Sequence, residues 1–123
     1  MIRLLIVDDA PFIREIVRHA VRNTDIEVIA EAEDGAEAVT LARELSPDVV
    51  LMDIVLPVKS GIDATREILE ANPAIRVIAF STNDHETIVV KALDAGCCSF
   101  IVKPFQANEL IEAIEQAVQS KSA

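Results

Sequence analysis

The sequence predicts a three-layer α/β fold, in which a doubly wound parallel sheet of five strands lies between two layers of helices. Short apolar runs, typical of strands buried on both faces, alternate with amphipathic helical segments along the 123 residues. The connections are short, and strands linked through helices form right-handed βαβ units. No repeat, linker or low-complexity segment interrupts this alternation. We therefore expect one domain over residues 1–120 and a loose tail over 121–123.

Each predicted strand is a short run of mainly apolar residues that stops at polar or turn-forming residues. The second run alternates polar and apolar residues only briefly, which is typical of a strand at the edge of a sheet. The third run is apolar from Val49 to Met52, so we expect it to be central and buried on both faces. The predicted strands are residues 2–7, 26–30, 48–53, 75–80 and 99–102.

The predicted helices combine apolar residues at helical spacing with residues that favour helix ends. Pro11 suits the first turn of the first helix. Asp84 is a good N-cap for the fourth helix, and Gly96 suits its C-terminal end. Ser46-Pro47 and Asn72-Pro73 should end the second and third helices, because the residue before proline disfavours helical geometry. The predicted helices lie within residues 11–22, 36–45, 62–71, 85–95 and 109–118.

The composition excludes several classes of function. A formal net charge of −10 argues against a nucleic-acid binder, which normally presents a basic face. No apolar run reaches the roughly 18 residues of a membrane span, and Asp8-Asp9 interrupts the only candidate signal peptide. We expect a cytoplasmic monomer that binds neither nucleic acid nor membrane. Cys97 and Cys98 are adjacent, so they should remain reduced thiols, since neighbouring residues form a disulfide only with strain.

Polar side chains end four of the five strands. The first strand ends in Asp8-Asp9, the third in Asp53, the fourth in Ser81-Thr82 and the fifth in Lys103. In a parallel sheet these ends lie along one edge, which is where ligands bind in open α/β folds. We therefore expect three carboxylates, a hydroxyl and an ammonium to converge there.

Three neighbouring carboxylates raise one another's pKa values, and a divalent cation relieves that repulsion. Carboxylate oxygens suit Mg²⁺, which keeps several waters and completes its coordination with phosphate oxygens. Lys103 is a point charge suited to the same phosphate. A carboxylate such as Asp53 can act as the nucleophile toward a phosphoryl group and form an aspartyl-phosphate. The pattern therefore favours phosphoryl transfer to Asp53.

These residues resemble the receiver domain of two-component response regulators over essentially the whole chain. The matching segments are Val7-Asp8-Asp9, Met52-Asp53, Pro57, Gly61, Ser81 and Lys103-Pro104-Phe105. Because nothing is appended, the sequence is similar to single-domain, CheY-like chemotaxis receivers. The resemblance implies a (βα)5 flavodoxin-like fold with strand order 2-1-3-4-5. It also implies that the protein is not an enzyme on a separate substrate, but catalyses only its own phosphorylation and dephosphorylation.

The resemblance also implies roles for the residues at the strand ends. Asp53 accepts a phosphoryl group from a histidine kinase. Asp8 and Asp9 bind Mg²⁺ together with Asp53 and the backbone carbonyl of Val55. Lys103 pairs with a phosphoryl oxygen, and the bond to Pro104 that follows it is expected to be cis.

Two further positions match the switch of the family. The resemblance implies that Ser81 moves to hydrogen-bond the phosphoryl group and that Phe100 fills the vacated space. The output surface would be formed by the fourth helix, the fifth strand and the last helix, with a flagellar motor or chemotaxis component as partner. The run 88–90 is apolar throughout, so either one of its residues faces outward on this surface or the helix has a wide core face.

Some positions depart from the commonest family pattern. Ser81 often appears as Thr in relatives, and Thr82, frequently Ala there, can crowd the approach of the phosphoryl group. Val55 and Asn83 flank the site where relatives tune the attack of water, which leaves the phosphorylated lifetime open. Phe100 lacks a hydroxyl, so its inward state gains no hydrogen bond.

Other functions fit less well or remain open. A phosphatase of the haloacid-dehalogenase type would need a second Asp where Val55 stands. A flavodoxin-like cofactor site would need a phosphate loop where Asp8-Asp9 would repel the phosphate. A pseudo-receiver that serves as a docking module remains an alternative, as does a phosphate-sink or relay receiver without motor output. The cognate kinase, the output partner, any change in oligomeric state and a role outside motility are also left open.

Overall fold

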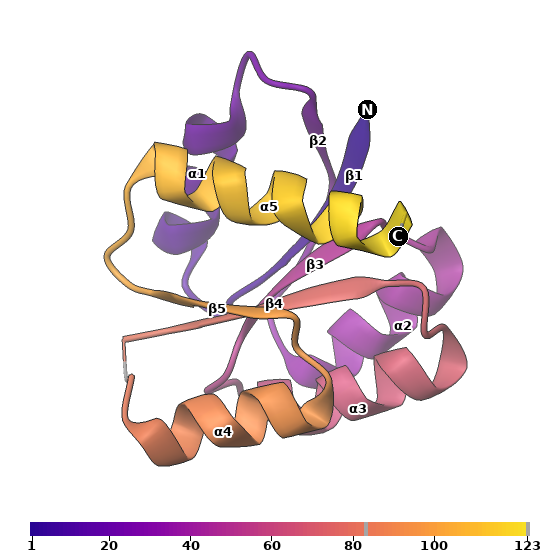
Figure 1. Ribbon diagram of the computed structural model, residues 1–123. Coiled ribbons are helices and arrows are strands. Elements are labelled where there is room, and N and C mark those ends of the chain that lie inside the picture. Colours follow the sequence, from indigo (N-terminus) through magenta and orange to yellow (C-terminus); the bar gives the residue numbers. More distant parts are fainter. Residues whose placement is uncertain (83, 123) are drawn as a thin grey trace.

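The computed structural model describes residues 1–82 and 84–122, with side chains to residue 119, and confirms the predicted architecture (Figure 1). All strand pairs are parallel, and their order is β2-β1-β3-β4-β5. The strands are β1 (Ile2–Val7), β2 (Ile26–Ala32), β3 (Val49–Asp53), β4 (Arg76–Ser81) and β5 (Ser99–Val102). The helices are α1 (Pro11–Val21), α2 (Gly35–Leu45), α3 (Gly61–Ala71), α4 (Glu86–Ala95) and α5 (Ala107–Ser122).

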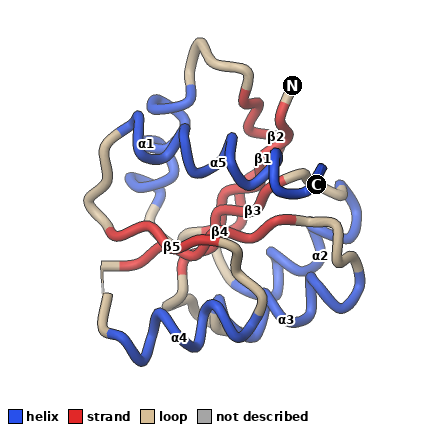
Figure 2. Tube along the Cα trace, in the orientation of Figure 1, coloured by secondary structure: helices blue, strands red, loops and turns tan. Residues whose placement is uncertain are grey.

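The sheet separates two apolar cores, because successive side chains of each strand point to opposite faces. Helices α1 and α5 cover one face, and α2, α3 and α4 cover the other, as Figure 2 shows in blue around the red strands. In β1, Leu5 and Val7 face the second group of helices, whereas Leu4 and Ile6 face α1 and α5. Every residue of β3 is buried, as expected for the central strand of such a sheet.

Register brings the carboxyl ends of the strands to one edge. Val7 of β1 lies beside Met52 of β3, and Asp53 lies beside Phe80 of β4. The backbone pairing continues one residue beyond the strands, since the amide of Lys103 donates to the carbonyl of Ser81 at 2.9 Å. The residues that follow β1, β3 and β5 therefore start from the same level of the sheet.

The helix ends lie within two residues of the sequence prediction, except at the C-terminal end of α5. Gly96 ends α4 in the left-handed conformation, with φ of 114°, as predicted. The N-cap of α4 is His85 and not Asp84, because the loop after β4 enters the helix one residue later than the local preference of Asp suggested. The tail that was expected to be loose over 121–123 overlaps the end of α5. Helix α5 continues to Ser122 because no glycine or proline interrupts it, and residue 123 lies outside the described residues.

Candidate functional site

Asp53 ends β3 and lies at the bottom of the acidic site. The residue is 6% exposed, and its Oδ1 accepts a hydrogen bond from the amide of Val55 at 3.2 Å. Helix α3 begins directly against this strand end. A Cβ added to Gly61 would lie 2.0 Å from the carbonyl oxygen of Asp53, so only glycine permits this close approach. The sequence therefore places a buried carboxylate at a tightly packed junction of strand and helix.

Three carboxylates meet at this edge, as predicted from the strand ends. Asp8, Asp9 and Asp53 each offer an oxygen, and these oxygens lie within 4.8 Å of one another. Asp8 is 1% exposed, and its Oδ1 accepts from the amide of Ala10 at 2.9 Å. Asp9 is exposed. Within the cluster, Asp8 and Asp53 are therefore buried, whereas Asp9 faces solvent.

Lys103 reaches the carboxylates from the end of β5. Its Nζ donates to Oδ2 of Asp8 at 2.7 Å and lies 3.4 Å from Oδ2 of Asp53. The ammonium also lies 4.3 Å from the centre of the Phe80 ring, in cation–π geometry. Phe80 in turn packs edge-to-face against Phe105. The Lys103-Pro104 peptide bond is cis.

The charges at this edge do not balance. In the described part of the chain, one ammonium and three carboxylates share the cluster. Burial raises the pKa of Asp53 to about 6; the charge of Lys103 opposes this increase, and the charge of Asp8 adds to it. An uncompensated buried carboxylate is costly, and a bound cation would offset that cost. Hard carboxylate oxygens on neighbouring loops are ligands that suit Mg²⁺, so the donor set fits this ion.

The remaining predicted residues are buried to different extents. Ser81 is buried at the end of β4. Phe100 in β5 is half-buried and packs against the core beneath α2, α3 and α4. Thr82 and the side chain of Val55 are exposed. Asn83, expected beside the site, lies outside the described residues.

Two neighbours of the site were not predicted from the sequence. Phe80 looked like an ordinary core residue, yet its ring supports the Lys103 ammonium. Arg14 of α1 belongs to no predicted motif, yet its Nη1 donates to the backbone carbonyl of Asp8 at 2.6 Å. Neither contact has a sequence signal, because each depends on side-chain directions across different elements.

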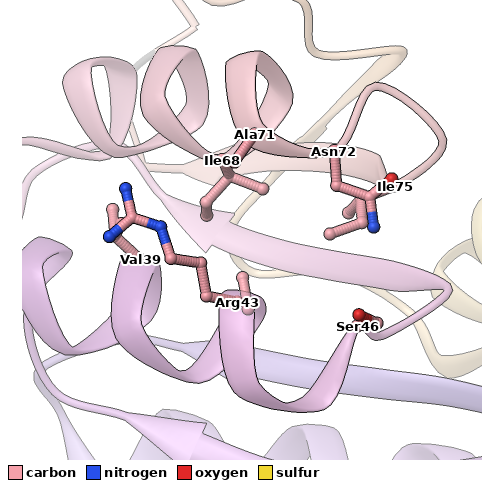
Figure 3. Close-up of a pocket in the computed structure, with 8 residues that line it drawn as sticks. Val39, Arg43, Ser46, Ile68, Ala71, Asn72 and Ile75 are labelled. Carbon is pink, nitrogen blue, oxygen red and sulfur yellow. The ribbon is translucent and has the colours of Figure 1, made fainter.

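A separate hollow of about 160 Å³ lies between α2 and α3 (Figure 3). It lies at the opposite edge of the sheet, where these two helices end and β4 begins. Arg43 is the only charged residue among its lining residues, which are Val39, Ala42, Arg43, Ser46, Ile68, Ala71, Asn72 and Ile75. These lining residues include no carboxylate, histidine or cysteine, so they offer neither a set of metal ligands nor a base that could activate the hydroxyl of Ser46. The chemistry is therefore assigned to the acidic cluster.

The fold and the site together define a class of protein, a flavodoxin-like α/β domain with an acidic cluster at the carboxyl edge of its sheet. Within that class, the family model for the response regulator receiver domain matches residues 4–115. The chain therefore belongs to the family of response regulator receiver domains. Receiver domains of this family are regulators and not classical enzymes.

Individual relatives agree with this assignment. The chain is 44% identical over 119 residues to the chemotaxis protein CheY of Listeria monocytogenes, covering 97% of this chain and 100% of that protein. The response regulator domain of CheB from Thermotoga maritima has a TM-score of 0.90 and 37% identity, covering 97% of both chains. The receiver domain of the sensor histidine kinase PA1611 from Pseudomonas aeruginosa has a TM-score of 0.86 and 29% identity, covering 95% of this chain and 97% of that one. That structure has a magnesium ion coordinated in its active site cleft.

Proposed function

We propose that this protein is a Mg²⁺-dependent phospho-acceptor that takes a phosphoryl group on Asp53 from a histidine kinase. The observation that carries the proposal is the convergence of Asp8, Asp9, Asp53 and Lys103 at one edge of the sheet. This set contains a nucleophile, ligands for a hard cation and a positive charge for the incoming phosphate. The magnesium ion in the related receiver of PA1611 supports the choice of metal.

The proposed reaction exchanges one phosphorus bond for another. A carboxylate oxygen of Asp53 attacks the phosphorus, and the bond between phosphorus and the imidazole nitrogen of the kinase breaks. Asp8, Asp9 and the backbone carbonyl of Val55 would hold Mg²⁺ together with Asp53. The ion would supply positive charge for the carboxylates and for the transferring phosphoryl oxygens. Lys103 then exchanges part of its contact with Asp8 and Asp53 for a phosphoryl oxygen.

The same proposal includes a switch and an output surface. Ser81 would turn its hydroxyl toward the phosphoryl group, and Phe100 would move into the space behind it. The surface of α4, β5 and α5 offers exposed apolar side chains for a partner, since Val90 is 47% exposed, Leu93 48% and Val102 39%. Within the run 88–90, Ile88 and Val89 are half-buried and Val90 faces outward. We infer that phosphorylation changes the affinity of this surface for its partner.

The relatives support a role in chemotaxis, with a flagellar motor or chemotaxis component as the output partner. The match to CheY of Listeria monocytogenes extends over the full length of that protein.

A cytoplasmic location is part of this proposal. Among residues 1–82 and 84–122, no helix is long and apolar enough to cross a membrane.

Intact-protein mass spectrometry tests the acceptor chemistry. The native chain is incubated with a small acyl phosphate, with and without Mg²⁺, beside Asp53→Asn and the control Asp94→Asn, which removes an exposed carboxylate of α4. We expect one phosphoryl adduct that requires Mg²⁺, is absent from Asp53→Asn and persists in Asp94→Asn. An adduct that survives in Asp53→Asn would place the acceptor elsewhere. No adduct and no Mg²⁺ binding would leave the docking-module alternative.

A further inference from the structure

The guanidinium of Arg14 turns back from α1 toward the loop that carries Asp8 and Asp9. Its Nη1 donates to the carbonyl of Asp8 at 2.6 Å, and its Nε donates to Oε1 of Glu31 in β2 at 2.7 Å. Its Nη2 lies 4.0 Å from Oε1 of Glu33. The Arg14 side chain is only 11% exposed. The planar fork is therefore held on three sides, with little freedom to reorient.

The carbonyl that Arg14 binds belongs to the peptide that joins Asp8 to Asp9. Because a peptide is planar, fixing its oxygen also sets the direction in which the chain leaves toward the Cα of Asp9. Asp8 has other anchors, since its amide donates to the carbonyl of Ala32 at 3.1 Å and its carboxylate accepts from the amide of Ala10. Asp9 differs: within the described ranges its carboxylate is exposed and has no hydrogen bond or ion pair. The direction of the Asp9 side chain is therefore determined by the backbone around it.

Glu31 keeps the Arg14 fork in place. One carboxylate oxygen of Glu31 accepts from Arg14 and the other accepts from Arg18. Burial alone would raise the pKa of Glu31, but the hydrogen bonds from Arg18 and Arg14 offset it and leave that pKa below its ordinary value. Glu31 therefore stays ionised at neutral pH and ties α1 to the edge strand β2.

We propose that Arg14 is a positioning residue for the cation site. By holding the Asp8–Asp9 peptide, it directs the Asp9 carboxylate toward Asp8 and Asp53. This inference rests on the proposed Mg²⁺ site. Its general basis is that groups which orient metal ligands without touching the metal typically change metal affinity by about 10–100-fold when removed.

Arg18 supplies a matched control for Arg14. Both arginines lie on α1 and both pair with Glu31, but only Arg14 contacts the carbonyl of Asp8. Replacing either by Gln removes one positive charge and one partner of Glu31. Arg14 also lies 4.0 Å from the exposed carboxylate of Glu33, but an exposed ion pair contributes little. A difference between the two variants therefore reports mainly the bond to Asp8.

Electrostatics and positioning predict opposite signs for Arg14→Gln. Removing a cation beside an acidic cluster strengthens the binding of another cation, because a repulsion is lost. Losing the orientation of Asp9 weakens it. A weaker Mg²⁺ affinity in Arg14→Gln therefore cannot result from the change in charge.

The test measures Mg²⁺ affinity by isothermal titration calorimetry and the backbone amide resonances of the metal-free chain by NMR. We expect Arg14→Gln to bind Mg²⁺ about tenfold more weakly, and to shift or broaden the resonances of Asp9 and Ala10. Arg18→Gln should bind Mg²⁺ at least as tightly as the native chain and leave these resonances unchanged. Arg14→Lys keeps the charge, but a single ammonium cannot bind both Asp8 and Glu31 as the guanidinium does. Its Mg²⁺ affinity should therefore fall between those of Arg14→Gln and Arg18→Gln.

The outcomes separate this inference from the proposed function. Equal or tighter Mg²⁺ binding by Arg14→Gln, with unchanged Asp9 and Ala10 resonances, would overturn the positioning role. If the native chain fails to bind Mg²⁺, the proposed function fails, and the metal-free resonances of the variants still decide whether Arg14 orients Asp9. If circular dichroism shows that Arg14→Gln does not fold, the comparison of Arg14→Lys with Arg18→Lys, which both keep the positive charge, decides the same question.

Discussion

The central strand β3 is preceded by one aspartate and ends in another, and the two carboxylates have opposite surroundings. Asp48, just before the strand, accepts a hydrogen bond from the amide of Arg3 at 2.9 Å, and its own amide donates to the carbonyl of Arg3. Asp53, at the far end, is buried beside a second buried carboxylate, and burial raises its pKa to about 6. The same residue type therefore stabilises the fold at one end of the strand and destabilises it at the other.

Hydrogen-bond donors and the balance of nearby charges, more than burial, distinguish an aspartate that stabilises the fold from one that is available for chemistry. The carboxylate of Asp48 accepts a hydrogen bond from the amide of Arg3 on the neighbouring strand β1, so it stabilises the fold. At the other end, Asp8 and Asp53 share the single ammonium of Lys103, and the described residues leave an excess of negative charge. The protein keeps that excess at the edge where ligands bind, at a cost to its own stability.

The largest effect should come from removing the ammonium. Lys103→Met keeps the length of the side chain but leaves Asp8 and Asp53 unpaired, and breaking a buried ion pair typically costs about 3–5 kcal/mol. We expect a loss of this size in the free energy of unfolding, measured with urea at pH 7.5 in the presence of a chelator. Mg²⁺ should recover part of it, because the ion replaces the missing positive charge.

Lys91→Met is the control for this prediction. Lys91 is exposed on α4, and no ion pair of Lys91 occurs within the described residues, so its replacement should change stability by less than about 0.5 kcal/mol. Equal losses in Lys91→Met and Lys103→Met would show that the chain responds to total charge and not to the ion pair.

The next effect should be a gain in stability from Asp53→Asn. The unfolded chain loses the proton of Asp53 near its ordinary pKa of 3.8, whereas the metal-free folded protein keeps it to about pH 6. Stability therefore falls as pH rises through this window, by about 3 kcal/mol for a shift of roughly two units. Asp53→Asn has no such proton to lose, so it should be more stable than the native chain by about this amount at pH 7.5.

The pH dependence supplies the control within the same pair of proteins. Below pH 3.8 the carboxyl is protonated in both folded and unfolded chains, so the gain should vanish there. Urea denaturation in a chelator at pH 7.5, 5 and 3.5 measures the difference at each point. A gain that stays constant across these values would show that the amide packs better than the carboxyl and that ionisation is not the cause.

The contrast between the strand ends also shows what could be predicted from sequence. The five strands and the carboxylates at their ends follow from local patterns, since an apolar run that stops at an acid places that acid at the edge of the sheet. Parallel register then brings Asp8 and Asp53 together without any knowledge of side-chain packing. The fold and most of the site were therefore accessible from the sequence and its resemblance to receivers.

The supporting contacts were not accessible in this way. Arg14 lies among charged residues of an amphipathic helix, and nothing in its spacing distinguishes it from Arg18, yet only Arg14 reaches the carbonyl of Asp8. The N-cap of α4 was misplaced by one residue for a related reason, because the path of a loop decides where a helix begins. Contacts that depend on the relative placement of elements need coordinates.

The smallest effect, and the sharpest comparison, comes from making the same substitution at the other end of β3. Asp48→Asn keeps an oxygen that can accept from the amide of Arg3 but removes the charge that strengthens this bond. We expect stability at pH 7.5 to fall by about 1 kcal/mol, the difference between a charged and a neutral hydrogen bond. Identical changes at the two ends of one strand should thus have opposite signs.

A gain in stability for Asp48→Asn would contradict the local explanation. Removing any carboxylate from a chain of net charge −10 relieves general repulsion, and such relief would act alike at both ends of the strand. Repeating both measurements in about 1 M salt separates the two causes, because long-range repulsion between exposed charges is then screened beyond roughly 3 Å. If the opposite signs persist in high salt, the difference belongs to the hydrogen bonds of Asp48 and to the buried, unbalanced charge around Asp53.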